Sequence, residues 1–261
     1  MGNNVGAKTA DLKFFEMQQS DRSLNVLRLG RSSYLEVWNL QKEMQRARIA
    51  KAIEDTVIVC EHEPVVTLGT SGKRESILAA PEVMKERGVE VFEVERGGDA
   101  TYHGPGQLVL YPILDLSLKK RDVHWYMRRL EDCLIKTLEH YSVSSEAVSG
   151  KTGVWIRNLG PGKRPRKIAS LGVRISRWCT MHGLALNVSA CNEGFSLINP
   201  CGFTDIEITS IEQESGLKFD VWDVADKLLD SFSVVFGYAE RRSMPPEEIS
   251  GGLSLQLSKA G

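Results

Sequence analysis

The most constraining feature of the sequence is residues 96–116, which read RGGDATYHGPGQLVLYPILDL. Gly97 and Gly98 permit positive φ and a close backbone approach, and a Gly-Pro-Gly turn at 104–106 precedes the apolar run 108–116. This order predicts a loop that leads into a buried strand. Polar groups crowd the loop where a simple turn carries small solvated residues, so we favour a functional site over a glycine-rich hairpin with a structural histidine.

Composition bounds the class of protein. With 261 residues and 42% hydrophobic content, the chain is long enough to bury a substantial core, and we expect one domain. A net charge of -1 gives no drive toward nucleic acid, and no apolar run is long enough to span a membrane. The five cysteines are scattered and follow no secretory signal, which is typical of a reducing compartment, so we expect a cytoplasmic protein.

Strand and helix patterns occur in mixed order along the chain. Ser33, Asp122 and Asp220 each precede apolar residues at helical spacing and can cap a helix. Strand patterns are found at 26–29, 56–60, 89–94, 108–116, 153–156, 167–175 and 182–188. The order predicts an α/β (α+β) fold in which a mixed sheet is flanked by helices.

The expected domain covers residues 22–239. Residues 1–21 are predicted to be a flexible lead-in, and residues 240–261, which lack periodicity, a disordered tail. Glu61-His62-Glu63-Pro64 is interpreted as a solvated strand end, because proline ends the strand and alternate side chains diverge.

Three downstream motifs complete a longer pattern. They are Lys167-Ile168-Ala169-Ser170-Leu171-Gly172, His182-Gly183-Leu184-Ala185-Leu186-Asn187 and Asn199-Pro200-Cys201-Gly202. With R-G-G-x-x-T-Y-H-G-P-G-Q ahead of them, they resemble, in order, the octanoyltransferases of lipoate biosynthesis over roughly residues 24–236. The resemblance implies the catalytic-domain fold of biotin and lipoate ligases. It also implies transfer of an octanoyl group from octanoyl acyl carrier protein to lipoyl domains of 2-oxoacid dehydrogenases and the glycine cleavage H protein, with no cofactor and no metal.

Cys201 and Lys167 are the predicted catalytic residues. Strand alternation places Lys167 on an apolar face, where its amine is either desolvated or snorkels outward. Cys201 stands between a proline and a glycine outside any periodic segment, and a nucleophilic thiol needs a base or cation beside it. From the pattern alone a buried inert thiol is the favoured interpretation, because that is the commonest state of a cysteine. The resemblance implies that Cys201 is the nucleophile and Lys167 its partner.

The predicted substrate-binding residues come from the same motifs. They are Arg96, Gly97, Gly98, Asp99, Ala100, Thr101, Tyr102, His103, Ser170, Leu171, Gly172, Gly183, Leu184 and Ala185. Small residues make one face of each of two strands nearly bare, so we expect these faces to adjoin and to form the floor of a groove for a medium-length acyl chain. The resemblance places His103 in the substrate-binding loop, and we assign it to binding rather than to a base.

Several alternatives remain open at this stage. Cys179 and His182 have the spacing of a zinc pair but lack a second close pair. An ATP-dependent lipoate or biotin ligase, a coenzyme A- or amide-dependent acyltransferase and a non-catalytic acyl-carrier or lipoyl-domain binding module are compatible with the same fold. The basic loop that carries Lys163, Arg164 and Arg166 is either a docking surface for an acidic carrier or a solvated turn.

Overall fold

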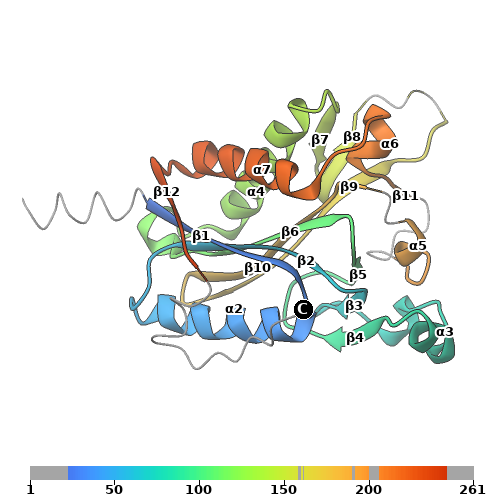
Figure 1. The fold of residues 1–261 in the computed structure, drawn as a ribbon, viewed down its shortest axis with the longest axis horizontal. Coiled ribbons are helices and arrows are strands. Elements are labelled where there is room, and N and C mark those ends of the chain that lie inside the picture. Colours follow the sequence, from blue (N-terminus) through green and yellow to red (C-terminus); the bar gives the residue numbers. More distant parts are fainter. Residues whose placement is uncertain (1–22, 158–159, 161, 190–191, 200–205, 246–261) are drawn as a thin grey trace, which may run out of the picture.

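The computed structural model describes residues 23–157, 160, 162–189, 192–199 and 206–245. Within them, the main sheet has nine strands in the order β12-β1-β2-β6-β10-β9-β8-β7, with β11 paired to β9. A second sheet of three strands has the order β4-β3-β5. The predicted α/β class with a mixed sheet flanked by helices is confirmed (Figure 1).

The first half of the chain contributes three strands of the main sheet and all of the small sheet. Its elements are β1 (Ser23–Ser32), α2 (Tyr34–Ile49), β2 (Thr56–His62), β3 (Val65–Leu68), the 3-10 turn η1 (Arg74–Ser76), α3 (Pro81–Glu86), β4 (Glu90–Glu93), β5 (Ala100–His103), β6 (Gln107–Ile113) and η2 (Leu116–Leu118).

The second half contributes the antiparallel strands at the other edge and two long helices. Its elements are α4 (Val123–Glu139), β7 (Ser145–Val148), β8 (Lys151–Ile156), β9 (Arg166–Ser176), β10 (Cys179–Asn187), α5 (Asn192–Phe195), β11 (Glu207–Ile208), α6 (Ile211–Ser215), α7 (Val221–Phe236) and β12 (Glu240–Ser243).

The main sheet is buried on both faces. Helices α4 and α7 cover one face, where Leu134 and Phe232 join a core that includes Leu184 and Leu186 of β10 (Figure 1). Helix α2 covers the other face, where its apolar residues pack against Tyr111 and Ala185. No helix in the described part of the chain has the length and apolar character needed to cross a membrane.

Helix boundaries follow the predicted caps. The side chain of Asp122 accepts a hydrogen bond from the Trp125 N–H and begins α4, and Asp220 accepts one from the Trp222 N–H and begins α7. Gly237 ends α7 with a φ of 78°, in the left-handed region that glycine favours. Ser33 precedes α2 but its side chain makes no capping hydrogen bond.

Three local expectations were wrong. Residues 240–243 form β12, which pairs in parallel with β1, so a tail without structure cannot begin at 240. Residues 100–103 form β5 of the small sheet rather than a loop. His62 is fully buried rather than part of a solvated strand end. Burial is possible because its Nε2 accepts a hydrogen bond from the Tyr111 hydroxyl at 2.8 Å and its Nδ1 donates one to the Ser32 carbonyl at 3.1 Å. The predicted lead-in, residues 1–21, and the remainder of the predicted tail, residues 246–261, lie outside the described residues.

Candidate functional site

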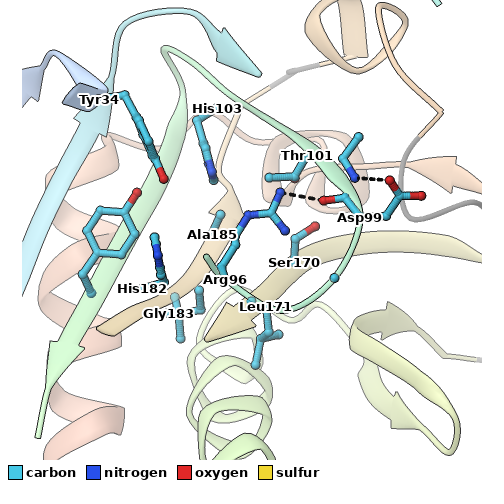
Figure 2. A pocket seen from close by; sticks show the side chains of 15 residues that line it. Tyr34, Arg96, Asp99, Thr101, His103, Ser170, Leu171, His182, Gly183 and Ala185 are labelled. Carbon is cyan, nitrogen blue, oxygen red and sulfur yellow. Dashed lines mark hydrogen bonds between the residues drawn. The ribbon is translucent and has the colours of Figure 1, made fainter. Parts of the chain in front are cut away.

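A pocket lies where the segment of residues 96–103, here called the strap, crosses β9 and β10 (Figure 2). Its lining consists of Tyr34, Arg96, Gly98, Asp99, Ala100, Thr101, His103, Tyr111, Ser170, Leu171, Gly172, His182, Gly183, Leu184 and Ala185. All of the predicted substrate-binding residues line it except Gly97 and Tyr102. The three predicted segments, which are far apart in the sequence, therefore meet around one cavity.

The floor of the pocket depends on the register of β9 and β10. Gly172 pairs with Gly183, and Ser170 pairs with Ala185, so the small residues do adjoin as expected. The two glycines have separate reasons for their size. A Cβ on Gly172 would lie 2.9 Å from the Gly97 carbonyl oxygen, and a Cβ on Gly183 would lie 2.2 Å from the Leu110 carbonyl oxygen. Gly172 leaves space for the backbone of the strap, and Gly183 leaves space for the backbone of β6. Both glycines are therefore required by backbone packing, whether or not an acyl chain is bound.

Arg96 holds the strap in place. Its guanidinium donates to the side-chain and backbone oxygens of Thr67 and to the carbonyl oxygens of Gly97 and Asp99, at 2.7 to 3.1 Å. The Gly97 N–H donates to the Val173 carbonyl at 2.9 Å, which ties the strap to β9 and engages that amide. Arg96 thus shapes the pocket through the backbone that it binds.

One end of the pocket is closed by side chains that the sequence did not indicate. Tyr34 comes from α2, Tyr111 from β6 and His182 from β10. The rings of Tyr111 and His182 meet edge to face with their centroids 6.5 Å apart, and Figure 2 shows Tyr34 and His182 at the same end of the pocket. His182 has a φ of 58°, so the alternation of β10 is broken there. Regular strand alternation predicts that His182 points with Leu184 and Leu186, but its ring lies against Tyr111 on the α2 side of the sheet.

His103 is held by a chain of buried amides. Its Nδ1 donates to Gln107 Oε1 at 2.6 Å, Gln107 Nε2 donates to Asn187 Oδ1 at 2.9 Å, and Asn187 Nδ2 donates to the Thr209 carbonyl at 2.9 Å. Burial lowers the pKa of His103 to about 3, which makes its ring neutral and a poor proton acceptor at pH 7. This environment supports a binding role for His103 over a role as a base.

Lys167 is buried at the start of β9, with 3% of its surface exposed. Its Nζ lies 5.3 Å from the centroid of the Trp155 ring, within reach of a cation–π interaction. The lysine stem crosses Gly153: a Cβ on that glycine would lie 2.5 Å from Lys167 Cε. The side chain of Lys167 is therefore buried and does not snorkel outward, and Gly153 and Trp155 on β8 are supporting residues that no sequence motif indicated.

We expect Gly153→Ala to destabilise the protein by about 3 kcal/mol. The new Cβ would meet both Lys167 Cε and the Ala169 carbonyl oxygen, and the φ of 120° is strained for any residue with a side chain. Gly150→Ala is the matched control on the same hairpin, because its φ is 77° but no atom lies within 4 Å of its Cβ position. That change should cost only about 1 kcal/mol. Urea denaturation measures both, and equal losses would contradict the steric argument.

Cys201 and Cys191 lie outside the described residues, but both ends of the segment that carries Cys201 are anchored. Before it, the Asn199 N–H donates to the Ser76 carbonyl at 2.7 Å, and the Ser76 hydroxyl donates to Asp99 Oδ1 of the strap at 2.8 Å. After it, Ile208 of β11 pairs with Lys167. The described residues on either side of 200–205 thus contact the strap and the strand that carries the lysine.

The three cysteines in the described part of the chain are all buried. Cys60, Cys133 and Cys179 are free and buried, and burial raises the pKa of each thiol, that of Cys179 to about 11. Such thiols are poor nucleophiles at neutral pH. Among the described residues, no group of three or more histidine, cysteine, aspartate or glutamate side chains is placed to hold a metal ion.

The three cations of the basic loop have different environments. Arg166 forms a two-bond ion pair with Glu214, with both nitrogen–oxygen distances 2.8 Å. Lys163 and Arg164 are exposed. Arg166 therefore belongs to the framework that joins β9 to α6, and the predicted docking surface is reduced to the other two cations.

Comparison with known proteins places the chain in a family. Residues 33–233 match the lipoyl protein ligase A/B catalytic domain, and the chain belongs to that family. A bipartite lipoate protein ligase from Thermoplasma acidophilum has a similar fold, with a TM-score of 0.65 at 14% identity over 87% of this chain and 89% of that chain.

Curated relatives are closer in sequence. The chain is 42% identical over 216 residues to an octanoyltransferase of Chloroflexus aggregans, a match that covers 82% of this chain and 96% of the relative. It is 45% identical over 198 residues to an octanoyltransferase of Acidobacterium capsulatum, covering 73% of this chain and 80% of the relative. The resemblance found in the motifs therefore extends over most of the chain.

Proposed function

We propose that this protein is an octanoyltransferase, which moves an octanoyl group from octanoyl acyl carrier protein to the acceptor lysine of lipoyl domains in the cytoplasm. The acceptors are the lipoyl domains of 2-oxoacid dehydrogenases and the glycine cleavage H protein. The observation that carries the proposal is the pocket under the strap, whose floor of paired small residues lies a few residues along β9 from the buried amine of Lys167. The octanoyltransferases to which the chain is similar support the same activity.

The reaction has two acyl transfers. Lys167 takes up the Cys201 proton or stabilises the resulting thiolate, which attacks the carbonyl carbon of the donor thioester. The carbon–sulfur bond to the carrier breaks, the carrier thiol leaves, and the octanoyl group remains on Cys201. The neutral amine of the acceptor lysine then attacks this second thioester, the carbon–sulfur bond to Cys201 breaks as the amide forms, and the proton lost by the amine passes to the released Cys201 thiolate or to Lys167. A thioester is already activated, so neither transfer consumes ATP.

The anchored ends of the Cys201 segment support this pairing. Asn199, the described residue that precedes residues 200–205, donates its N–H to the Ser76 carbonyl at 2.7 Å. Asn199 is tied through Ser76 to Asp99, which lines the pocket. Beyond the segment, the Thr209 N–H donates to the Lys167 carbonyl at 3.0 Å. The segment thus connects the pocket wall to the strand that carries the proposed partner.

Intact-mass measurement of a lipoyl domain tests the function. Incubated with the enzyme and octanoyl acyl carrier protein in the absence of ATP, the domain should gain one octanoyl group. Free octanoate or lipoate with ATP should give no product. Modification only in the second mixture would assign an ATP-dependent ligase, and modification in neither would assign a binding module.

We expect charge reversal at Lys163 and Arg164 to raise the KM for octanoyl acyl carrier protein by about tenfold at low salt. These two exposed cations precede β9, and attraction to an acidic carrier accelerates encounter in a salt-dependent way. The KM for a small octanoyl thioester should not change. Reversal of the exposed cations Lys136 on α4 and Lys227 on α7 is the matched control. An equal KM increase for both donors would exclude docking at this loop.

A further inference from the structure

We propose that His182 sets the maximum length of the acyl chain by closing the far end of the pocket. The inference rests on the proposed function and adds a specificity-determining residue to it. His182 reaches this position because its left-handed backbone, with a φ of 58°, turns the ring out of the strand's regular alternation and into the cavity (Figure 2).

The dimensions of the pocket fit this role. We call the end of the pocket nearest to Lys167 its head, because the reacting carbonyl group has to lie there. Ser170 and its partner Ala185 mark this end, since they are the lining residues of β9 and β10 nearest to that lysine. From Ala185 back to His182 the strand rises three residues, or about 10 Å. An extended chain advances about 1.3 Å per bond, so the seven carbon–carbon bonds of an octanoyl group span about 9 Å. An eight-carbon chain that begins at the head therefore ends at His182.

The His182 side chain is the wall that separates the pocket from an outer groove of the protein. Behind it lies Glu95, whose Oε2 is 3.9 Å from His182 Nε2, too far for a hydrogen bond. Glu95 also lines a separate outer groove with Lys42, Arg46 and Arg174. Removal of the imidazole would thus extend the pocket past Glu95 toward this groove.

The wall is fixed and uncharged. The Gln41 side-chain oxygen accepts a hydrogen bond from the His182 N–H at 2.9 Å, which holds the backbone. The Nε2 atom of His182 is buried and has no hydrogen-bond partner among the described residues. Burial lowers the pKa of His182, so the ring is neutral at pH 7 and can contact a terminal methyl group without burying a charge.

The test is a chain-length series. Octanoyl, decanoyl and dodecanoyl acyl carrier proteins are supplied to the wild type, which should prefer octanoyl. In His182→Gly, glycine accepts the left-handed backbone and the ring is absent. Each methylene taken out of water gives about a fourfold gain. Decanoyl has two more methylenes than octanoyl, so the kcat/KM ratio of decanoyl to octanoyl transfer should rise by about fifteenfold. His182→Asn, which also tolerates this φ, should shift the ratio less, in the same direction.

Two controls separate chain length from general damage. Arg174→Ala removes the ion pair with Glu95, whose atoms lie 3.1 Å apart on the outer side of the wall, and should leave the ratio unchanged. Ala185→Leu narrows the head of the pocket and should reduce transfer of every chain by a similar factor. Thermal unfolding verifies that each variant is folded.

An unchanged ratio in the folded His182→Gly and His182→Asn variants would overturn the proposal and leave the octanoyltransferase assignment intact. Absence of transfer by the wild type with every donor would instead refute the proposed function, and the inference with it.

Discussion

Cys201→Ala is expected to abolish both the acyl adduct and the transfer of the octanoyl group, with a loss of on the order of 10⁴-fold or more. The wild-type protein incubated with octanoyl acyl carrier protein alone should gain one octanoyl group by intact mass spectrometry. The variant should gain none, because the mechanism proceeds through a thioester on this sulfur and no water or side chain can replace it at comparable rate.

The other cysteines provide the controls for this experiment. Cys60, Cys133 and Cys179 are buried with raised pKa values, so their alanine variants should keep the adduct and lose only stability. Peptide mapping of the adduct locates the modified residue. Transfer at the wild-type rate by Cys201→Ala would remove this cysteine from the mechanism.

Lys167→Ala is expected to slow acylation of Cys201 by about 10²- to 10⁴-fold at neutral pH, the range typical of a lost proton acceptor. The rate at which an alkylating agent modifies Cys201, measured against pH, tests the coupling directly. In the wild type the thiolate should form at lower pH than in the variant, because a cation or base beside a thiol favours its ionised form.

Lys151 is the matched control for Lys167. Its Nζ lies 5.7 Å from the same Trp155 ring, at a distance close to that of Lys167, but it stands on β8 and is only partly buried. Lys151→Ala should leave both acylation and the alkylation profile unchanged. An alkylation profile that is the same in Lys167→Ala and the wild type would show that the lysine and the cysteine are not coupled.

Much of the framework was predictable from local signals. Asp122 and Asp220 begin helices because their carboxylates satisfy free N–H groups, and the two-residue alternation of β9 and β10 predicted that their small residues would meet. The strap, Lys167 and most of the pocket lining came from motifs within single segments. These features are encoded within about ten residues of the sequence, which is why they were found.

The remaining parts depend on contacts between distant segments. Nothing near Ala100–His103 indicates that these residues pair with β3, and His62 is buried only because Tyr111 and Ser32 satisfy its ring. The residues next to His182 in the sequence likewise do not indicate its positive φ. Regular strand alternation therefore predicts that the ring lies on the side of Leu184 and Leu186 and not on the α2 side. Tyr34 belongs to a helix whose register against the sheet is a tertiary property.

The contact between Gly153 and the stem of Lys167 has an evolutionary consequence. Because one side chain occupies the space that the other position leaves empty, the two sites form an epistatic pair. A lysine at 167 requires glycine at 153, but shortening the lysine does not make a larger residue at 153 acceptable, because the Ala169 carbonyl oxygen and the φ of 120° still oppose a side chain there. A lineage that lost the lysine would therefore still retain glycine at 153, and simple reversion at 167 would remain open.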